Sequence, residues 1–308
     1  MWGMLKPTYW DMKLKIASRS SKLALKQVEE FNKTFLIKEY DLIETSTRGD
    51  ELSAKGETLF DKGNFVSDIE ELILNDSVDV AIHSAKDMPA KETKGLKHLY
   101  FIENSERKVK DLLIFRKDTK PNFKSEMKLG TSSLRRKMQA KFHMNATNIE
   151  PLNGNIDTRI KKLNDGQYDC IILAEAGISR LDFLIQNQNY TRLDHATCSG
   201  QGVLAVQWKE GSSAESIIES SQTYKDMANL NQEINMEREL LVKLNADCNS
   251  AISLFASGDY LKGEIYGLEN FISFSGNDIN EILKDIHKKN GIKLLHEHNW
   301  YKYKYQRF

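Results

Sequence analysis

The stretch Gly130-Thr131-Ser132-Ser133-Leu134-Arg135-Arg136 places three hydroxyl groups and two guanidinium groups where a strand gives way to a helix. A helix start offers unpaired N–H groups and partial positive charge, and Arg binds carboxylate or phosphate through paired hydrogen bonds. Neighbouring arginines on a helix point about 100° apart, so we expect Arg135 and Arg136 to hold two different acidic groups. The stretch therefore predicts a site for a ligand with several acids; the alternative is a Ser N-cap followed by solvated arginines.

Outward from this stretch, short apolar strands alternate with amphipathic helices, which predicts two α/β units in tandem. The first unit has expected strands at Lys13–Ala17, Asp41–Thr47 and Val78–Ile82, and helices that present Ala24, Val28, Phe31 and Phe35, then Val66, Ile69, Leu72 and Ile73. The second has expected strands at Leu112–Phe115, up to Leu129 and at Asp169–Ala174, with a helix after Ser133 and another presenting Ile156, Ile160 and Leu163. We expect largely parallel sheets, which bind ligands beyond the carboxyl ends of their strands.

The remaining sequence predicts a smaller α+β unit at the C-terminus. It opens near Ala228 with a helix presenting Met236, Leu240, Leu241 and Leu244, continues with antiparallel strands at Ala251–Ala256, Leu261–Leu268 and Phe271–Ser275, and closes with a helix presenting Ile279, Leu283 and Ile286. The apolar run Val203–Trp208 is expected to return to the first sheet, and the Ser/Gly/Glu-rich stretch Glu210–Ser221 to be a linker. The expected domains are residues 12–104 with 201–223, residues 108–198, and residues 228–308.

Composition excludes several classes of protein. The 308 residues are 40% hydrophobic, which is enough for two or three cores. Lys plus Arg and Asp plus Glu number 44 each, so no global basic field points to nucleic acid. Because no run of ~18 apolar residues and no signal-peptide pattern is present, we expect a chain that neither spans a membrane nor is exported.

The three cysteines are widely spaced and form no C-x-x-C pair, which argues against a disulfide framework or a zinc site and for a reducing cytoplasm. Cys170 lies in an apolar strand and is expected to be buried. Cys198 lies in a Ser/Gly loop. Cys248 lies on a turn from which its thiol either reaches an interdomain space or is idle. The tail His296–Phe308 fits a surface strand or a frayed end better than a metal or nucleic-acid site.

A second motif, His83-Ser84-Ala85-Lys86-Asp87-Met88-Pro89, follows the expected strand Val78–Ile82. Lys86 and Asp87 should leave a turn at the carboxyl edge of the sheet, and Pro89 prevents a simple helix there. Asp87 would be a single negative group where anions bind, and such a carboxylate stabilises a cation that develops during a reaction. The alternative is an Asx turn or an N-cap.

Basic residues recur at comparable positions of both α/β units. They are found in Ala17-Ser18-Arg19-Ser20-Ser21 at the first strand-to-helix junction, in Thr158-Arg159 after Asn153-Gly154-Asn155, and at Arg180 after the strand that ends at Ala174. Surface charges scattered for solubility have no reason to share this placement. The pattern predicts a cleft between domains that binds an organic polyanion.

Taken together and in order, these motifs resemble the porphobilinogen deaminase family, also called hydroxymethylbilane synthase. The resemblance runs from about Lys13 to the end of the third unit and includes Ile16–Leu25, Thr47–Asp50, His83–Pro89, Gly130–Arg136, Gly154–Leu163, Tyr168–Leu173 and Gly200–Gly202. It implies two domains like periplasmic binding proteins plus a third domain. It also implies a monomeric cytoplasmic transferase of heme biosynthesis that joins four porphobilinogen molecules head to tail, with loss of ammonia, and releases a linear tetrapyrrole.

The resemblance also implies roles for individual residues. Asp87 matches the catalytic aspartate, and Cys248 matches the cysteine that carries a dipyrromethane cofactor through a thioether. Cofactor or substrate contacts are implied for Arg19, Ser21, Lys62, Phe65, Ser84, Lys86, Thr131, Ser132, Ser133, Arg135, Arg136, Asn153, Arg159, Ala174, Arg180, Gln201 and Gly202. No metal, nucleotide, nucleic acid or membrane is implied.

Three departures from the family pattern are visible. Asn153 stands where the family has an arginine, which weakens one carboxylate clamp to a neutral donor. The cysteine loop reads Ala246-Asp247-Cys248 instead of Gly-Gly-Cys, and the charge of Asp247 would raise the pKa of the thiol. The segment Ser53–Phe65 is one residue short, so that a family lysine falls at Glu57 or Thr58, with Lys55 or Lys62 as replacements.

Two further readings use the same residues. One is a non-catalytic binder of organic polyanions on a hinged α/β pair, and the other is a decayed deaminase that folds without turnover. The Asp87 motif has no purpose in a simple anion trap, and a periplasmic receptor would need a signal peptide. Intact mass separates these readings, because only the enzyme carries a cofactor on Cys248.

Overall fold

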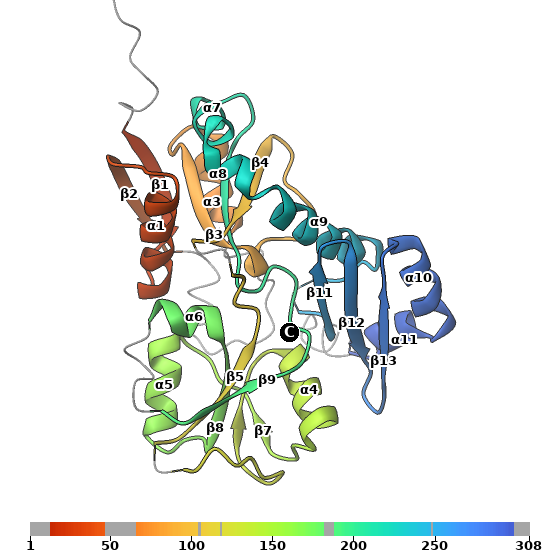
Figure 1. Ribbon diagram of the computed structural model, residues 1–308. Coiled ribbons are helices and arrows are strands. Elements are labelled where there is room, and N and C mark those ends of the chain that lie inside the picture. Colours follow the sequence, from red (N-terminus) through yellow and green to blue (C-terminus); the bar gives the residue numbers. More distant parts are fainter. Residues whose placement is uncertain are drawn as a thin grey trace, which may run out of the picture.

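The computed structural model describes residues 13–46, 66–103, 106–117, 119–181, 188–247 and 249–298. Within these residues the strands form two five-stranded sheets and one three-stranded sheet. Figure 1 shows the first sheet at the top, the second at the bottom and the third to one side. The strands of each predicted unit thus lie in a sheet of their own.

The first sheet has the strand order β2-β1-β3-β10-β4. Its strands are β1 (Leu14–Arg19), β2 (Tyr40–Thr45), β3 (Val80–Ser84), β4 (Leu96–Phe101) and β10 (Leu204–Lys209), and its helices include α1 (Lys22–Thr34) and α3 (Ser67–Leu74). The pairs β1–β2 and β1–β3 are parallel, whereas β10 runs antiparallel to both of its neighbours. The predicted return of the chain to the first sheet at residues 203–208 is therefore confirmed.

The second sheet repeats this arrangement with the order β7-β6-β8-β5-β9. Its strands are β5 (Asp111–Phe115), β6 (Leu129–Gly130), β7 (Ile149–Glu150), β8 (Cys170–Ala174) and β9 (Tyr190–Leu193), and its helices are α4 (Leu134–Met144), α5 (Ile156–Asn164) and α6 (Glu175–Arg180). The strand in fourth place, β5, is again antiparallel to both neighbours. The chain crosses between the sheets before β5 and before β10, so each crossing leads into the antiparallel strand of the sheet it enters.

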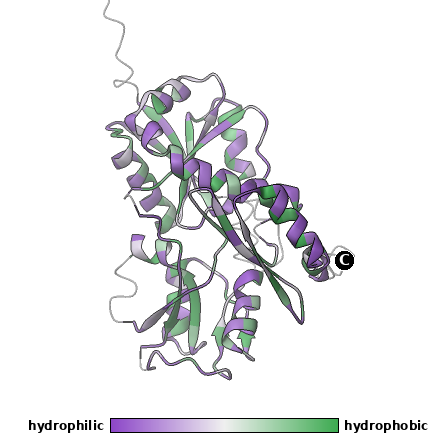
Figure 2. Ribbon diagram, turned by 45° about the vertical axis from the view of Figure 1, so that its right-hand side comes forward, coloured by the Kyte–Doolittle hydropathy of each residue, from purple (hydrophilic) through white to green (hydrophobic). Residues whose placement is uncertain are grey.

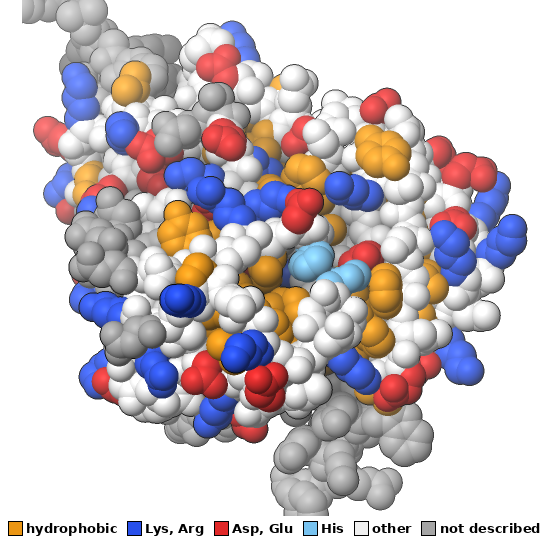
Figure 3. All heavy atoms as spheres, turned by 60° about the horizontal axis from the view of Figure 1, so that its bottom comes forward, with side chains coloured by type: hydrophobic (Ala, Val, Ile, Leu, Met, Phe, Trp, Pro, Cys, Tyr) orange, Lys and Arg blue, Asp and Glu red, His pale blue; other side chains and the backbone are white. Residues whose placement is uncertain are grey.

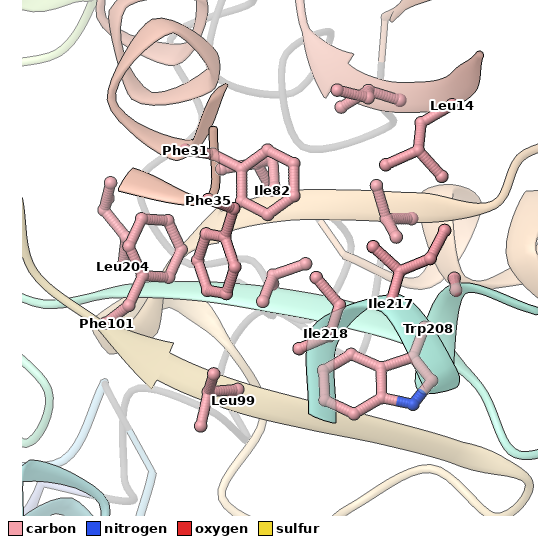
Figure 4. Close-up of a cluster of buried hydrophobic side chains, with 14 of the residues drawn as sticks. Leu14, Phe31, Phe35, Ile82, Leu99, Phe101, Leu204, Trp208, Ile217 and Ile218 are labelled. Carbon is pink, nitrogen blue, oxygen red and sulfur yellow. The ribbon is translucent and has the colours of Figure 1, made fainter. Parts of the chain in front are cut away.

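The core of the first unit lies between its sheet and α1. Phe31, Phe35 and Phe101 pack with ring centroids 4.9–5.9 Å apart, and Trp208 is 1% exposed (Figure 4). Ser21 caps α1, because its Oγ accepts a hydrogen bond from the N–H of Ala24. In Figure 2 the strands are mostly hydrophobic, whereas the helices carry both kinds of residue, as expected for elements with one face against a core.

The expected linker Glu210–Ser221 is wrong. Residues Ser213–Ser220 form the helix α7, followed by α8 (Gln222–Asp226). Ala214, Ile217 and Ile218 of α7 are buried in the first core. The small and polar residues of this stretch resemble a loop in composition, but its three apolar positions lie on one face of a helix.

The third unit consists of α9 (Ala228–Lys243), β11 (Ile252–Ser257), β12 (Tyr260–Tyr266), β13 (Phe271–Gly276), α10 (Ile279–Lys288) and α11 (Gly291–Glu297). Its three strands form an antiparallel meander whose core includes Leu240, Leu241 and Ile286. The start of the tail differs from the prediction: α11 continues to Glu297, and His298 is buried with Nε2 2.9 Å from the carbonyl oxygen of Tyr266. Residues 299–308 lie outside the described part.

The predicted fold class, two α/β units and a smaller α+β unit, is confirmed. The exact domain boundaries stay a prediction. None of the helices in the described ranges has the length and apolar character needed to cross a bilayer.

Candidate active site

A cavity of about 310 Å³ lies where the three units meet. Its walls come from the ends of β1 and β3, the 3₁₀ turn Ala85–Asp87, the starts of α4 and α5, α6, the loop 198–203 and α9. Asp247, Asn249, Ser250, Ile252 and Leu254 complete them. The ends of β1 and β3 and the helix starts are positions at the carboxyl edges of the sheets, where the sequence predicted the site.

The structure brings most of the predicted site residues to this cavity. Those that line it are Arg19, Ser21, Ser84, Lys86, Asp87, Ser132, Ser133, Arg135, Arg136, Asn153, Arg159, Ala174, Arg180, Gln201 and Gly202. Thr131 is buried behind the wall, where its Oγ1 accepts a hydrogen bond from the N–H of Ser133 at 3.3 Å. Lys62, Phe65 and Cys248 lie outside the described residues, as do Thr47–Asp50 and Ser53–Phe65.

Asp87 ends the 3₁₀ turn that follows β3, as the motif predicted. In the described part of the chain, no hydrogen bond or ion pair is formed by its carboxylate, which lines the cavity. Lys86 precedes it, and burial lowers the pKa of this lysine even though Asp87 acts in the opposite direction. An acceptor oxygen at this position is available to the N–H groups of a ligand.

The two arginines of the opening stretch do not point toward separate acidic groups. Both bind the buried Asp111, which receives Arg135 Nη1 at 2.8 Å, Arg136 Nε at 3.1 Å and Arg136 Nη2 at 2.7 Å. These guanidinium groups, with Gln201, hold the pKa of Asp111 well below its usual range although burial alone would raise it. Two cations share one anion, so this wall keeps a net positive charge.

Arg159 lines the cavity without a carboxylate partner in the described residues. Its Nε donates to the carbonyl oxygen of Gly154 at 2.6 Å, and in the described residues it forms no ion pair with a carboxylate. Burial, followed by the nearby Arg136, lowers its pKa to about 10. A buried cation of this kind gains most from an anionic ligand.

Arg180 lies at the end of α6 and is paired with a protein carboxylate. Its Nε is 2.9 Å from both Oε1 and Oε2 of Glu30, and its Nη2 is 2.9 Å from Oε2. Glu30 belongs to α1, so the pair joins the first and second units. Burial raises the pKa of Glu30, and Arg180 only partly offsets this effect.

Asp87 is not the sole acid of the cavity, which corrects the expectation of a single negative group. Asp157 and Asp247 also line it. Asp157 lies 3.8 Å from Lys22 Nζ, and Asp247 Oδ1 accepts hydrogen bonds from the N–H of Asn249 at 2.8 Å and from Ser250 Oγ at 3.1 Å. Both therefore have local partners.

Asn153, the departure from the family arginine, accepts a hydrogen bond from Ser132 Oγ at 2.7 Å. Lys162 Nζ donates to the backbone carbonyl of Asn153 at 3.1 Å, which brings a cation to this turn from behind the cavity wall. Gly154 supports the turn with a φ of +105°, where an added Cβ would lie 2.8 Å from Thr158 Cγ2.

The loop Gly200-Gln201-Gly202 anchors the crossing back to the first sheet. Gln201 is fully buried, and its Nε2 donates to Asp111 Oδ1 at 2.9 Å and to the carbonyl of Val109 at 2.8 Å. Gly202 has a φ of +85°, and a Cβ there would lie 2.5 Å from the carbonyl oxygen of Lys108. The two crossing segments therefore touch at a position that only glycine fits.

The described cysteines differ in environment. Cys170 is buried as predicted, and burial raises its pKa to about 12. Cys198 is partly exposed and lines the cavity, with Sγ 3.5 Å from Gln201 Oε1. Across the described residues, no cluster of three His, Cys, Asp or Glu is arranged to hold a metal ion.

Sequence reasoning missed three residues of this region. Arg238 of α9 lines the cavity and donates to the carbonyls of Ala85 and Pro89, so it supports the turn that carries Asp87. Gln27 of α1 lines it too and donates to Ser84 Oγ at 2.8 Å. Asp111, the first residue of β5, holds Arg135 and Arg136 and was not among the predicted site residues. Nothing in the neighbouring sequence distinguishes these side chains from ordinary helix or strand residues.

Comparison with known proteins matches one family model and several curated relatives. Residues 14–216 match the family described as porphobilinogen deaminase, dipyromethane cofactor binding domain. The porphobilinogen deaminase of Streptococcus sanguinis is 36% identical over 287 residues, covering 86% of this chain and 91% of that protein. That of Campylobacter fetus is 33% identical over 283 residues, 89% of this chain and 88% of that protein. A probable porphobilinogen deaminase of Methanocaldococcus jannaschii is 36% identical over 235 residues, 75% of each.

Among solved structures, the chain matches the second substrate binding domain of a putative amino acid ABC transporter from Streptococcus pneumoniae. The TM-score is 0.40 and the identity 14%, over 75% of this chain and 98% of that domain.

Proposed function

The chain belongs to the porphobilinogen deaminase family, and we propose that Asp87 and the cationic residues around it carry the reaction of that family in the cavity between the three units. The activity is that of a hydroxymethylbilane synthase, a transferase. Four porphobilinogen molecules are joined head to tail, one ammonia is lost for each, and hydrolysis releases the linear tetrapyrrole. This tetrapyrrole is the precursor of porphyrins and heme.

The charge of the cavity suits this substrate. Each porphobilinogen brings an acetate and a propionate, so the growing chain gains two carboxylates with every unit. Arg159 has no acidic partner in the described residues, and Arg135 and Arg136 share one carboxylate between them. These arginines balance carboxylates that enter the cavity, because a desolvated cation gains most from an ionic partner.

Asp87 acts on the pyrrole nitrogens. Loss of ammonia leaves an electrophilic azafulvene, whose positive charge is shared with the ring N–H. A carboxylate that accepts a hydrogen bond from this N–H stabilises the charge during deamination and coupling. The same oxygen is placed to assist loss of the proton from the α-carbon after the new bond forms. The single observation that carries this assignment is the Asp87 carboxylate, which lines the cationic cavity and, within the described part of the chain, forms no hydrogen bond or ion pair.

The cofactor is a dipyrromethane, as the family description states, and the residues present fit such a group. Asp247 and Asn249, the sequence neighbours of Cys248, both line the cavity. Two pyrroles carry four carboxylates, for which the cavity supplies guanidinium and ammonium groups. We assign Cys248 as the thioether attachment point. When bound, the cofactor supplies the nucleophilic α-carbon that the first substrate unit joins.

The remaining family residues are assigned to binding. Ser21, Ser84, Ser132, Ser133, Asn153, Ala174, Gln201 and Gly202 would contact cofactor or substrate through hydroxyl, amide or backbone groups, together with Arg19, Lys86, Arg135, Arg136, Arg159 and Arg180. Thr131 would act from behind by fixing Ser133. Lys62 and Phe65, outside the described residues, match the family loop over the site.

The partner of this protein is its small-molecule substrate. On the face shown in Figure 3, charges of both signs are interspersed around a short row of Lys and Arg side chains. This pattern, with 44 residues of each sign in the chain, supports no role in nucleic-acid binding. A cytoplasmic monomer is part of the proposal.

Intact mass spectrometry tests the function. Protein made with ample porphobilinogen should show a mass excess equal to two pyrrole units, located to the peptide that contains Cys248, and should release linear tetrapyrrole on incubation with substrate. An unmodified Cys248 under these conditions would contradict the proposal and favour the non-catalytic polyanion binder.

A further inference from the structure

Arg180 and Arg159 both line the cavity, but they differ in the charge behind them. Arg180 is clamped by Glu30 through Nε and Nη2, with all contacts at 2.9 Å. Arg159 donates to a backbone carbonyl, and within the described residues it forms no ion pair. The charge of Arg180 is therefore balanced one to one by the protein, whereas the charge of Arg159 is not.

The Glu30–Arg180 pair is shielded from solvent and joins two units. The side chains of Glu30 and Arg180 are only 16% and 12% exposed, so screening by water is weak and the charge of Glu30 acts strongly on its neighbourhood. Glu30 lies on α1 and Arg180 on α6, which contact each other and belong to different sheets (Figure 1). A second, looser bridge, Lys22–Asp157 at 3.8 Å, spans the same boundary.

The geometry leaves part of Arg180 for a ligand. Glu30 occupies one side of the guanidinium group, and in the described part of the chain Nη1 donates to no other residue. Because Arg180 lines the cavity, a ligand carboxylate that reaches Nη1 would place two carboxylates on one guanidinium group. The second carboxylate is attracted by Arg180 and repelled by Glu30.

We propose that Glu30 competes with the substrate carboxylates for Arg180 and thereby keeps their binding at Arg180 weak and exchangeable. The inference rests on the proposed function and deepens it, since it names Glu30 as a positioning residue that sets affinity at Arg180 without touching the pyrrole ring.

Weak binding of carboxylates at Arg180 suits a reaction that proceeds in repeated cycles. The pyrrole chain lengthens by one unit per cycle, so carboxylates bound in one cycle must shift before the next unit enters. A fully uncompensated arginine at every contact would hold each intermediate tightly and slow this shift. Arg159 and the Arg135–Arg136 pair, which keep net positive charge, provide the firm contacts, and Arg180 provides one that exchanges.

The test is Glu30→Gln, because the amide oxygen still accepts the N–H of Arg180 while the negative charge is removed. We expect the KM for porphobilinogen to fall about threefold to tenfold, which is the effect expected when one charge is removed at a partly shielded site. Enzyme species that carry one to three added units should also persist longer in the mass spectrum after a limiting pulse of substrate. The matched control is Glu29→Gln, which removes the same charge one residue earlier, where Glu29 pairs with Lys26 on the surface; its KM should equal that of the wild type.

A purely structural role predicts a different result. Loss of the bridge alone would lower the melting temperature of Glu30→Gln and leave the KM unchanged, and an unchanged or raised KM would overturn the inference. If Glu30→Gln does not fold, Glu30→Asp keeps the charge but shortens the reach, and its KM should lie below that of the wild type. Wild-type protein that makes no tetrapyrrole would overturn the proposed function and this inference together, whereas an active wild type with an unaltered variant KM would overturn the inference only.

Discussion

Asp111 receives both hydrogen bonds of the Arg136 fork, Nη2 to Oδ1 at 2.7 Å and Nε to Oδ2 at 3.1 Å, and this pair is buried at the wall of the cavity. The carboxylate also binds Arg135 and Gln201, so one side chain holds the start of α4 and the loop that returns to the first sheet. Arg135 and Arg136, two of the arginines that line the site, are thus held by a group that does not line it.

The first prediction concerns this buried group. Asp111→Asn leaves two guanidinium groups without a counter-charge, and we expect a loss of roughly 3–5 kcal/mol in the free energy of unfolding. Urea denaturation measures it. The control is Asp194→Asn, which removes an exposed carboxylate that pairs with Lys110, and its effect should stay within about 0.5 kcal/mol. Equal effects of the two variants would show that Asp111 has no special role.

Arg136→Leu removes one of the two cations held by Asp111. We expect the protein to fold but to keep the mass of the bare polypeptide, because the cavity then lacks a cation that balances the cofactor carboxylates. Intact mass spectrometry and a melting curve check the two parts. Arg192→Leu, at an exposed ion pair with Glu175, should carry the full cofactor mass. A cofactor mass excess in Arg136→Leu would remove this arginine from the proposed site.

Asp87→Asn keeps the size of the side chain and removes its charge. We expect turnover of porphobilinogen to fall about 10²- to 10⁴-fold, since the carboxylate no longer stabilises the charge on the pyrrole nitrogen or accepts a proton. The melting temperature should change little, because in the described residues Asp87 has no hydrogen-bond partner to lose. Asp165→Asn, at an exposed pair with Lys161, serves as the control. Wild-type turnover by Asp87→Asn would exclude the catalytic assignment.

The pH dependence of stability should report on His83. This histidine is buried, with Nε2 3.1 Å from Gln207 Oε1, and burial lowers its pKa from 6.5 to about 4. Between pH 4 and pH 6.5 the unfolded chain binds a proton at His83 and the folded chain does not. The contribution of His83 to the free energy of unfolding is therefore complete above pH 6.5 and is lost as the pH falls toward 4.

From pH 7 to pH 5 we expect the loss from His83 to be about 2 kcal/mol. Urea denaturation at the two pH values measures it in the wild type and in His83→Gln, in which this part of the pH dependence should disappear. An equally steep dependence in the variant would contradict the assignment to His83.

Most secondary structure followed from local pattern. The spacing of Ala24, Val28 and Phe31 defines the buried face of α1, and the apolar runs before Ser84 and up to Ala174 define β3 and β8. The stretch Glu210–Ser221 was missed for a physical reason. A short amphipathic helix needs only a few apolar residues when a core covers them, and residues such as Ser212 and Glu215 conceal that pattern.

The sequence by itself determined the α/β alternation and the positions at strand ends and helix starts where Asp87, Arg159 and their neighbours gather, because these depend on spacing within one element. It determined the family through the order of its motifs along the chain. Only the tertiary structure decided which of the cations are compensated. Asp111 lies 25 residues from Arg136, and Glu30 lies 150 residues from Arg180. The Asp111–Arg136 pair forms when β5 and α4 of the second unit pack together, and the Glu30–Arg180 pair forms when the first and second units meet. The shielding that makes both pairs strong exists only after packing has excluded the water around them.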